Sequence, residues 1–545
     1  MLHYLTIAEA ARLIRTRQLS PVELTEAYLE RIAEVDADLS CFIRVTPDAA
    51  QAAARQAEAM IARGEYKGAL HGIPLALKDI FDVAGIPTTA HSRVFQNYTP
   101  SRDAMVVGKL VAAGAVLLGK LATHECATGG PSFDLPWPPA RNPWNPAHYT
   151  GGSSSGSGAA VAAGLCAAAL GSDTGGSIRT PAAFCGVAGL KPTYGRVSVR
   201  GVLPLCRSLD NVGPLCRSAE DCGHVLQAIA GHDPLDPASI DRPVDDYLAK
   251  MDAGLKGLRV GLVRHFYETD RRATDEVVAA MDAAVEVLSA EGAAVHDIRL
   301  RPLADYEACF RLITVAEAYT LYARLLRERL ADFGEVLRYR VVPGVLVCAS
   351  DYLKARCQQR ALQAEIEEVL ATVDVLVTAS IHGPAPRLDA VPITENFSVP
   401  RLPSPFSVSK SPAISVLNGF SRSGLPLGMQ IAGRRFDEAT VLRVASAYER
   451  STTWRARQPS LAAAEMTRGV ATMPASRSAP RAETRGDAAA IDSGGPCRAD
   501  IETIARLAGL TLPPRQIDQL CEVAPFLWAM AARLPDDEPA SNSKS

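Results

Sequence analysis

The sequence has few aromatic residues, no long apolar segment and no excess of charge of either sign. Of its 545 residues, 6% are aromatic, and 57 basic against 60 acidic residues give a net charge of -3. This balance excludes strong attraction to nucleic acid or anionic lipid, so we expect neither a nucleic-acid nor a membrane partner. The longest apolar run, residues 159–170, is too short to span a bilayer and predicts a tightly packed core helix.

The twelve cysteines are spread singly along the chain, with no CxxC pair and no zinc-type spacing. Buried free thiols of a protein in the reducing cytoplasm are the better interpretation. Glu9 and Arg12 interrupt what would be the apolar core of a secretory signal. The pair His124-Glu125 is not followed by a second histidine at helical spacing, so we expect no metal centre. We therefore expect a cytoplasmic protein.

The main part of the chain alternates between two kinds of pattern. Helix-start signals occur at Thr6 with Glu9 and at Ser20 with Pro21. Later, β-like runs alternate with helical patterns at 274–290 and 438–449, which predicts an α/β layered sheet. The runs lie at 73–77, 115–118, 258–263, 374–378, 412–416 and 426–433.

The last part of the chain has a different composition. We expect a main domain over 1–455, a flexible linker over 456–498, a helical segment over 499–535 and a disordered tail over 536–545. Two amphipathic helices are predicted in the helical segment, over 501–512 and 514–534, with Pro525 kinking or ending the second. Because two short helices cannot form a core alone, this segment is expected to dock on its own or a neighbouring main domain.

Two glycine-rich stretches offer the first candidate chemistry. TGGSSSGSG at 150–158 resembles a flexible linker in composition. A helix expected to be buried follows it directly, however, so the segment that leads into this helix should be ordered. It lacks the lysine of a phosphate-binding loop. In GSDTGGSIRTP at 171–181, two glycines precede Ser177 and suit an oxyanion hole beside a nucleophile, although an ordinary glycine-rich turn fits equally well. Because Arg179 stands where a nucleophile elbow has glycine, a standard Ser-His-Asp hydrolase is not indicated.

A nucleophilic serine needs a base, and no histidine lies in or beside these loops. His71, His124 and His148 are nearest in sequence and are expected to be structural. The other candidate is Lys78, which ends the apolar run at 73–77. Desolvation by an apolar strand lowers a lysine pKa toward the neutral form, but an exposed strand-end lysine is the simpler interpretation of this residue alone.

Three motifs together resemble the amidase signature family. They are HGIPLALKD around Lys78, GGSSSGSG around Ser153 and GSDTGGSIRTP around Ser177. Further landmarks are RNPWN at 141–145, GLKPT at 189–193 and GLPLG at 424–428. The resemblance covers about residues 5–455 and implies a large mixed sheet covered by helices on both faces, an α/β/α architecture.

The resemblance also implies the roles of individual residues. Ser177 matches the nucleophile, Ser153 the bridging serine that follows a cis peptide bond, and Lys78 the base. The main-chain amides of the oxyanion hole correspond to Thr174, Gly175, Gly176 and the nucleophile itself. Supporting positions beside the triad are expected at Ser154, Asp173 and Arg179, the last two as an ion pair. No metal or cofactor is implied.

The same resemblance leaves several functions open. The first is hydrolysis of a small carboxamide to carboxylate and ammonia; the alternatives are the glutaminase (A-type) component of a tRNA-dependent amidotransferase, a biuret- or ureide-type hydrolase, and an inactive scaffold. Segments 129–140 and 406–412 depart from the amidotransferase glutaminase, whereas the C-terminal helices weakly resemble its small C-type companion. The intact triad argues against a scaffold. A homodimer is favoured by resemblance only, and the substrate stays open, with Phe133, Leu135 and Trp137 as candidates for an apolar acyl pocket.

Overall fold

A large mixed sheet forms the centre of the computed structural model, which describes residues 1–461 and 496–535. In this described part, eleven strands follow the order β1-β3-β2-β6-β8-β7-β12-β13-β11-β9-β10, and β4 and β5 form a separate ribbon. Strands are parallel near both edges, as in β3-β2-β6 and β11-β9-β10, and antiparallel from β6 through β13 to β11. The bounds are β1 Phe42–Val45, β2 Pro74–Lys78, β3 Val116–Leu121, β4 Arg141–Asn142, β5 Asn145–Tyr149, β6 Ala168–Asp173, β7 Ala188–Lys191, β8 Asn211–Cys216, β9 Arg259–Leu262, β10 Ala294–Asp297, β11 Val375–Ala379, β12 Ala413–Phe420 and β13 Pro426–Gly433.

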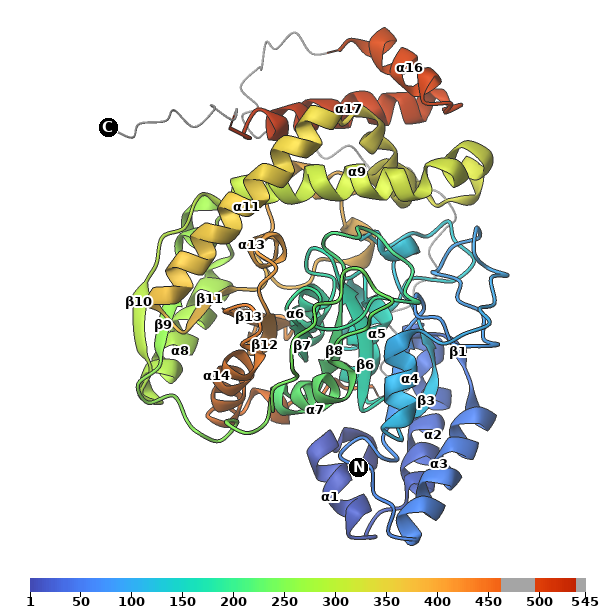
Figure 1. Cartoon of the computed structure of the whole chain (residues 1–545), viewed down its shortest axis with the longest axis vertical. Coiled ribbons are helices and arrows are strands. Elements are labelled where there is room, and N and C mark those ends of the chain that lie inside the picture. Colours follow the sequence, from blue (N-terminus) through green and yellow to red (C-terminus); the bar gives the residue numbers. More distant parts are fainter. Residues whose placement is uncertain (462–495, 536–545) are drawn as a thin grey trace.

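Helices cover both faces of this sheet, and the α/β prediction is confirmed (Figure 1). Their bounds are α1 Ile7–Arg15, α2 Pro21–Leu39, α3 Pro47–Ala62, α4 Met105–Ala112, α5 Ser155–Ala162, α6 Arg179–Cys185, α7 Ala219–Ile229, α8 Asp275–Ala290, α9 Leu303–Arg329, α10 Glu335–Val341, α11 Ala349–Thr372, α12 Glu395–Ser398, α13 Ser404–Val408, α14 Glu438–Arg450, α16 Arg498–Leu507 and α17 Pro514–Ala531. The first two start as their caps predict, because Thr6 and Glu9 form a capping box and the hydroxyl of Ser20 accepts from the amide of Val22.

The apolar run at 159–170 is not one helix, as the sequence suggested. Helix α5 ends at Ala162, Gly164 has φ +71°, and the chain then enters the central strand β6 at Ala168. The run is buried throughout, so it has no polar face from which a helix and a strand can be told apart. A residue with positive φ ends the helix, and glycine adopts that conformation without a Cβ clash.

The C-terminal helices lie at the opposite end of the molecule from α1–α3 (Figure 1). Most of the predicted linker and the predicted tail, residues 462–495 and 536–545, lie outside the described residues. Helix α16 ends at Leu507, five residues earlier than predicted, because Gly509 turns with φ +74°. Pro525 does not end the second helix, since α17 runs through it. The division of the chain into four parts stays a prediction.

Helix α17 packs against α9, α10 and the short 3-10 segment Val342–Leu346 of the same chain. Its inner face is apolar and buried. The buried apolar residues are Ile517, Leu520, Val523, Ala524 and Leu527, and the polar Gln516 is buried beside them. At the rim, Arg533 pairs with Asp305 of α9 at 3.2 Å, and Arg515 pairs with Glu335 at the start of α10. These contacts supply the apolar partner surface that two amphipathic helices require.

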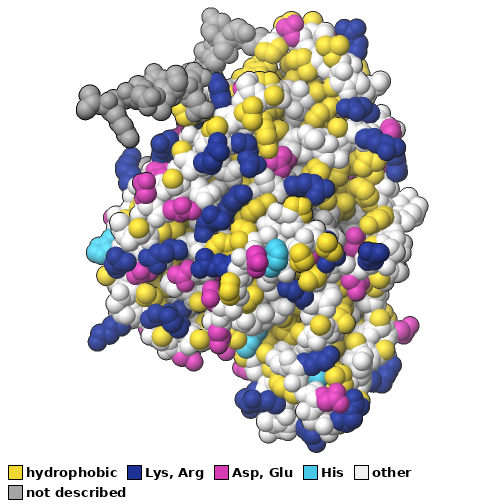
Figure 2. All heavy atoms as spheres, viewed as in Figure 1, with side chains coloured by type: hydrophobic (Ala, Val, Ile, Leu, Met, Phe, Trp, Pro, Cys, Tyr) yellow, Lys and Arg dark blue, Asp and Glu magenta, His cyan; other side chains and the backbone are white. Residues whose placement is uncertain are grey.

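On the face drawn in Figure 2, basic side chains are interspersed with acidic and apolar ones, so this face has no large patch of a single charge sign. Of the twelve cysteines, all free in the structure, eight are buried. Within residues 1–461 and 496–535, no helix combines the length and the hydropathy needed to cross a bilayer.

Candidate active site

Strand β2 carries Lys78 into the interior of the molecule. All five residues of the strand, PLALK, are buried, and Lys78 is the last of them. Its Nζ atom lies 2.8 Å from Oγ of Ser153 and 2.9 Å from Oγ of Ser172. The lysine that ends the apolar run is therefore not an exposed strand-end residue, because it is fully buried and hydrogen-bonds two serines.

Burial also changes the protonation of this lysine. It lowers the pKa of the Lys78 ammonium group from 10.5 to about 7, although the carboxylates of Asp210 and Asp173 act in the opposite direction. Removing a charged amine from water favours the neutral form, whose lone pair can accept a proton. Near neutral pH, about half of the Lys78 side chains can therefore act as a base.

The loop that carries Ser153 is ordered. The peptide bond between Gly152 and Ser153 is cis, as the resemblance implied. The carbonyl oxygen of Ser153 accepts hydrogen bonds from the amide of His124 and the hydroxyl of Thr123, each at 3.0 Å. A Cβ atom at Gly152 would lie 2.1 Å from Cε1 of His124, so this close approach of backbone to ring requires glycine.

The three histidines considered as bases have structural contacts instead. Nδ1 of His124 accepts from the amide of Gly130 at 2.6 Å, and burial holds the His124 pKa well below 6.5. His71 accepts from the amide of Lys67 at 3.1 Å. His148 lies 2.8 Å from the carbonyl oxygen of Ala385, a geometry in which its Nδ1 donates.

Ser177 precedes α6 and is partly exposed, whereas Thr174 and Gly175 just before it are buried. Its carbonyl oxygen accepts from the amide of Ser154 at 3.1 Å, which joins the two serine loops. Ser177, Gly152, Thr174 and Gly175 all line a cavity of about 60 Å³. The serine predicted as the nucleophile thus lines this cavity together with Thr174 and Gly175 of the same loop.

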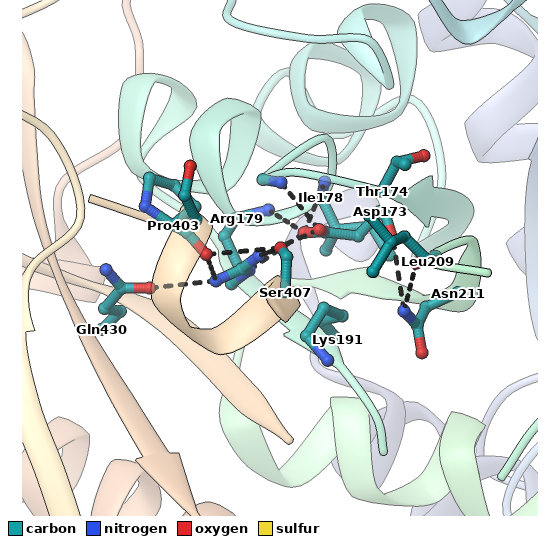
Figure 3. Close-up of polar contacts among 12 residues, drawn as sticks. Asp173, Thr174, Ile178, Arg179, Lys191, Leu209, Asn211, Pro403, Ser407 and Gln430 are labelled. Atoms are coloured by element: carbon teal, nitrogen blue, oxygen red, sulfur yellow. Dashed lines mark hydrogen bonds and ion pairs between the residues drawn. The ribbon is translucent and has the colours of Figure 1, made fainter. Parts of the chain in front are cut away.

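A buried ion pair braces the loop of Ser177, as Figure 3 shows. Arg179 Nη2 lies 2.9 Å from Oδ1 of Asp173, and both side chains are fully buried. Burial alone would raise the Asp173 pKa, but the Arg179 guanidinium outweighs it and lowers the value to about 2. Nη1 of Arg179 also donates to the carbonyl oxygen of Pro403 at 2.9 Å and to Gln430 at 3.2 Å. The predicted ion pair therefore forms, and it also anchors a distant segment beside the loop.

The amides predicted for the oxyanion hole have different surroundings. The N–H of Gly176 donates to the Asp173 carboxylate at 2.7 Å, so in this structure it braces the loop. Gly175 lies against the ring of Phe310, which would come within 2.2 Å of a Cβ atom. The hydroxyl of Thr174 donates to Asp210 at 2.6 Å. These contacts fix the backbone on both sides of Gly175.

Sequence reasoning missed Ser172, which shares Lys78 with Ser153. Ser172 lies near the end of β6, which runs parallel to β2. Ser154, expected near the relay, instead exchanges hydrogen bonds with the backbone of Ser172, at 3.2 and 3.3 Å. Ser172 lies within the GSDTGGSIRTP stretch, but the stretch does not reveal its contact with Lys78, which depends on the pairing of two strands about ninety residues apart in the chain.

The cavity at Ser177 adjoins a larger one of about 660 Å³, and the two share Gly129, Gly152, Arg340 and Arg401. The apolar residues proposed for the acyl pocket do not line either cavity in the described structure, and Phe133 is 57% exposed. Among the described residues, no three metal-binding side chains are gathered into one group.

Comparison with known proteins identifies relatives over most of the chain. The A-type component of the glutamyl-tRNA(Gln) amidotransferase from Chloroflexus aggregans is 38% identical over 493 residues, which cover 85% of this chain and 99% of that protein. A structure described as a vestigial protein complex that reveals the evolutionary origins of an s-triazine catabolic enzyme has a TM-score of 0.77 and 32% identity, covering 82% of this chain and 98% of that one.

Another similar structure is native peptide amidase from Stenotrophomonas maltophilia, with a TM-score of 0.72 and 32% identity, covering 83% of this chain and 98% of that chain. A sequence profile of the amidase family matches residues 23–442. With these residues matched and the same fold found in its relatives, the chain belongs to the amidase family of enzymes that act on amide C–N bonds.

Proposed function

We propose that the protein hydrolyses the C–N bond of a small carboxamide, with Ser177 as nucleophile, Ser153 as bridge and Lys78 as base. The observation that carries this proposal is the buried contact of 2.8 Å between Nζ of Lys78 and Oγ of Ser153. It connects an amine of pKa about 7 to a loop that is hydrogen-bonded to the loop of Ser177. Such an amine can accept a serine proton near neutral pH.

In the first half of the reaction, Oγ of Ser177 attacks the amide carbonyl carbon. Its proton passes to Ser153 while the proton of Ser153 passes to neutral Lys78. The same relay then returns one proton to the amide nitrogen as the C–N bond breaks, so ammonia leaves and an ester on Ser177 remains. In the second half, water attacks the ester, the relay takes its proton and returns it to Ser177, and the carboxylic acid departs.

Negative charge on the substrate oxygen requires hydrogen-bond donors during both halves. We assign the amides of Thr174, Gly175 and Ser177 to this role, because the amide of Gly176 already donates to Asp173. Gly175 is held against Phe310 and Thr174 against Asp210, so these donors need little reorganisation as charge develops.

A second candidate is the glutaminase of a tRNA-dependent amidotransferase, which the sequence left as an alternative. The relatives favour it, since A-type amidotransferase components match over nearly their whole length. A ureide hydrolase is the third candidate, suggested by the similarity to the s-triazine catabolic enzyme complex. All three use the same acyl transfer and differ in the acyl group and in the need for partner proteins.

The test is ammonia release by the purified full chain without tRNA or partner proteins. The panel contains aliphatic, aromatic, glutamine and ureide amides, and the variants are Ser177→Ala and, as a matched control, Ser101→Ala at an exposed loop position. Release by the wild type and the control, with loss in Ser177→Ala, supports a self-sufficient amidase. Release from no amide by a folded protein contradicts it, and equal release by Ser177→Ala contradicts the nucleophile.

A further inference from the structure

Residues 122–130, here called the bracing segment, hold the loop that carries Ser153. The amide of His124 and the hydroxyl of Thr123 each donate to the carbonyl oxygen of Ser153 at 3.0 Å. The carbonyl oxygen of the first residue of the segment accepts from the amide of Gly156 at 2.9 Å. The loop that presents the bridging serine is therefore held at two points by one short stretch of chain.

The bracing segment turns soon after His124. Cys126 and Ala127 have φ values of +47° and +58°, in the left-handed region that residues other than glycine seldom adopt. Such a conformation costs free energy and persists only where the surrounding contacts impose it. Ala127 and the two residues after it also line the cavity at Ser177. The shape of this turn therefore affects both the support of Ser153 and the wall of the cavity.

Glu125 lies between the residues that hold Ser153 and the left-handed pair, and its side chain is 2% exposed. Its Oε1 atom accepts from the hydroxyl of Ser92 at 2.6 Å, and its Oε2 atom accepts from the amide of Gly334 at 2.9 Å. Gly334 directly precedes α10, and a Cβ atom on it would lie 2.9 Å from Oε2 of Glu125. One buried carboxyl group thus ties the turn to two segments that are distant in the chain.

We propose that Glu125 is a positioning residue for the serine relay, which ties the bracing segment to α10 and so holds Ser153 against Lys78. This inference rests on the proposed acyl transfer at Ser177 and adds a residue to that reaction. Glu125 acts through the bracing segment and not on the substrate. Without its side chain, the left-handed turn can relax, and the contact of 2.8 Å between Ser153 and Lys78 lengthens.

This role requires hydrogen bonds and not a fixed charge. Burial raises the pKa of the Glu125 carboxyl to about 7, because the ionised form loses its hydration. The protonated carboxyl can donate its O–H to Ser92 and still accept from the amide of Gly334. A glutamine side chain offers the same two functions, with an amide N–H in place of the O–H. Glu125→Gln should therefore preserve the position of the turn, whereas Glu125→Ala should not.

A covalent probe of Ser177 measures the relay without knowledge of the substrate. When Ser177 reacts with an alkyl fluorophosphonate, its Oγ attacks phosphorus, fluoride leaves, and the serine proton passes through Ser153 to Lys78. Mass spectrometry of the full chain at several probe concentrations gives the maximal rate of labelling and the concentration at half of that rate. A misplaced Ser153 lowers the maximal rate, whereas a cavity of altered shape changes the concentration.

We expect Glu125→Ala to lower the maximal labelling rate about 10- to 100-fold, and Glu125→Gln to retain about a third of it or more. Glu449→Ala is the matched control. Glu449 is also buried, accepts from the amide of Ala219 at the start of α7 at 2.9 Å, and has its pKa raised by burial to about 7. This control should lower the melting temperature about as much as Glu125→Ala and leave the labelling rate unchanged.

Equal labelling rates in Glu125→Ala and wild type would overturn the inference, as would a loss in Glu125→Gln or Glu449→Ala as large as that in Glu125→Ala. Ser92→Ala removes one hydrogen bond of the carboxyl and decides the question if Glu125→Ala does not fold. It should slow labelling about threefold, and an unchanged rate overturns the inference. Slower labelling in these variants, with no amide cleaved by the wild type, supports the role of Glu125 and contradicts the proposed hydrolysis instead.

Discussion

The burial of Lys78 predicts how the activity of the enzyme depends on pH. A lysine of ordinary pKa 10.5 is neutral in only about one molecule in 3,000 at pH 7, whereas a pKa of about 7 makes half of the molecules neutral. The environment therefore increases the population of the active base about 1,500-fold, equivalent to about 4 kcal/mol. Because the base acts when deprotonated, kcat/KM should rise with pH and reach half of its plateau near pH 7.

Other titratable groups lie close enough to contribute. The Asp210 pKa is raised to about 6 by burial, and Asp173 stays ionised at a pKa of about 2, so both favour the protonated form of Lys78 at neutral pH. His124 is kept neutral by burial and by nearby cations that include Arg340 and Lys78. The midpoint expected in the pH profile of kcat/KM is therefore a property of Lys78 coupled to Asp210.

The assay compares wild type with Lys78→Met, which keeps an unbranched side chain as far as the Cε position and removes the proton-accepting nitrogen. We expect a loss of about 10² to 10⁴ in kcat/KM, the usual contribution of a general base, and no rise in activity around pH 7. The melting temperature should not fall, because a buried amine is replaced by an apolar group. A wild-type midpoint near pH 10, or a variant with more than about a tenth of the activity, would refute the role of Lys78.

Four further predictions follow from the same contacts. Ser172→Ala should lower kcat/KM about fivefold without lowering the melting temperature, since one hydrogen bond to Lys78 is lost; an unchanged rate would contradict it. Asp173→Asn should cost about 3–5 kcal/mol of unfolding free energy in urea, because Arg179 stays buried without its carboxylate. Gly152→Ala should destabilise by about 1–3 kcal/mol through the clash with His124, whereas Gly108→Ala, with open space around it, should not. Deleting residues from 456 onward should lower the melting temperature by at least about 2 °C, because α17 buries its apolar face on the main body; an unchanged value would contradict this docking.

Much of the fold was predictable because its strands and helices have distinct patterns. The run at 426–433 became β13 with the same bounds, and the predicted cap at Ser20 starts α2. The run at 159–170 failed because alanine carries no periodicity, so only the positive φ of Gly164 reveals where helix gives way to strand. Local patterns find elements that have one polar face, but they cannot divide a segment that is buried on all sides.

At the candidate site, too, some residues could be predicted from local sequence and others could not. The positions of Lys78, Ser153 and Ser177 were expected from three motifs, and the structure joins the first two by a hydrogen bond. Ser172 was not expected, because its contact with Lys78 depends on strand pairing. The contact between Arg311 and Arg401 was also missed, since the two residues come from separate segments that meet around Glu307 and Phe310. Sequence motifs therefore identify the residues proposed for the reaction, whereas contacts between distant segments become visible only in the structure.

The C-terminal helices contribute no reactive group, yet their packing reaches the cavity. Helix α17 contacts α9, which carries Arg311, and α10, which carries Arg340. At the start of α10, Glu335 accepts from Gln519 at 3.3 Å and also pairs with Arg515, both from α17. Arg340 is five residues further along the same helix and lines both cavities. Since α10 is only seven residues long, the contacts of α17 with its first residue hold a helix whose sixth residue lines both cavities, so we expect that removing the appended helices also alters the cavity at Ser177.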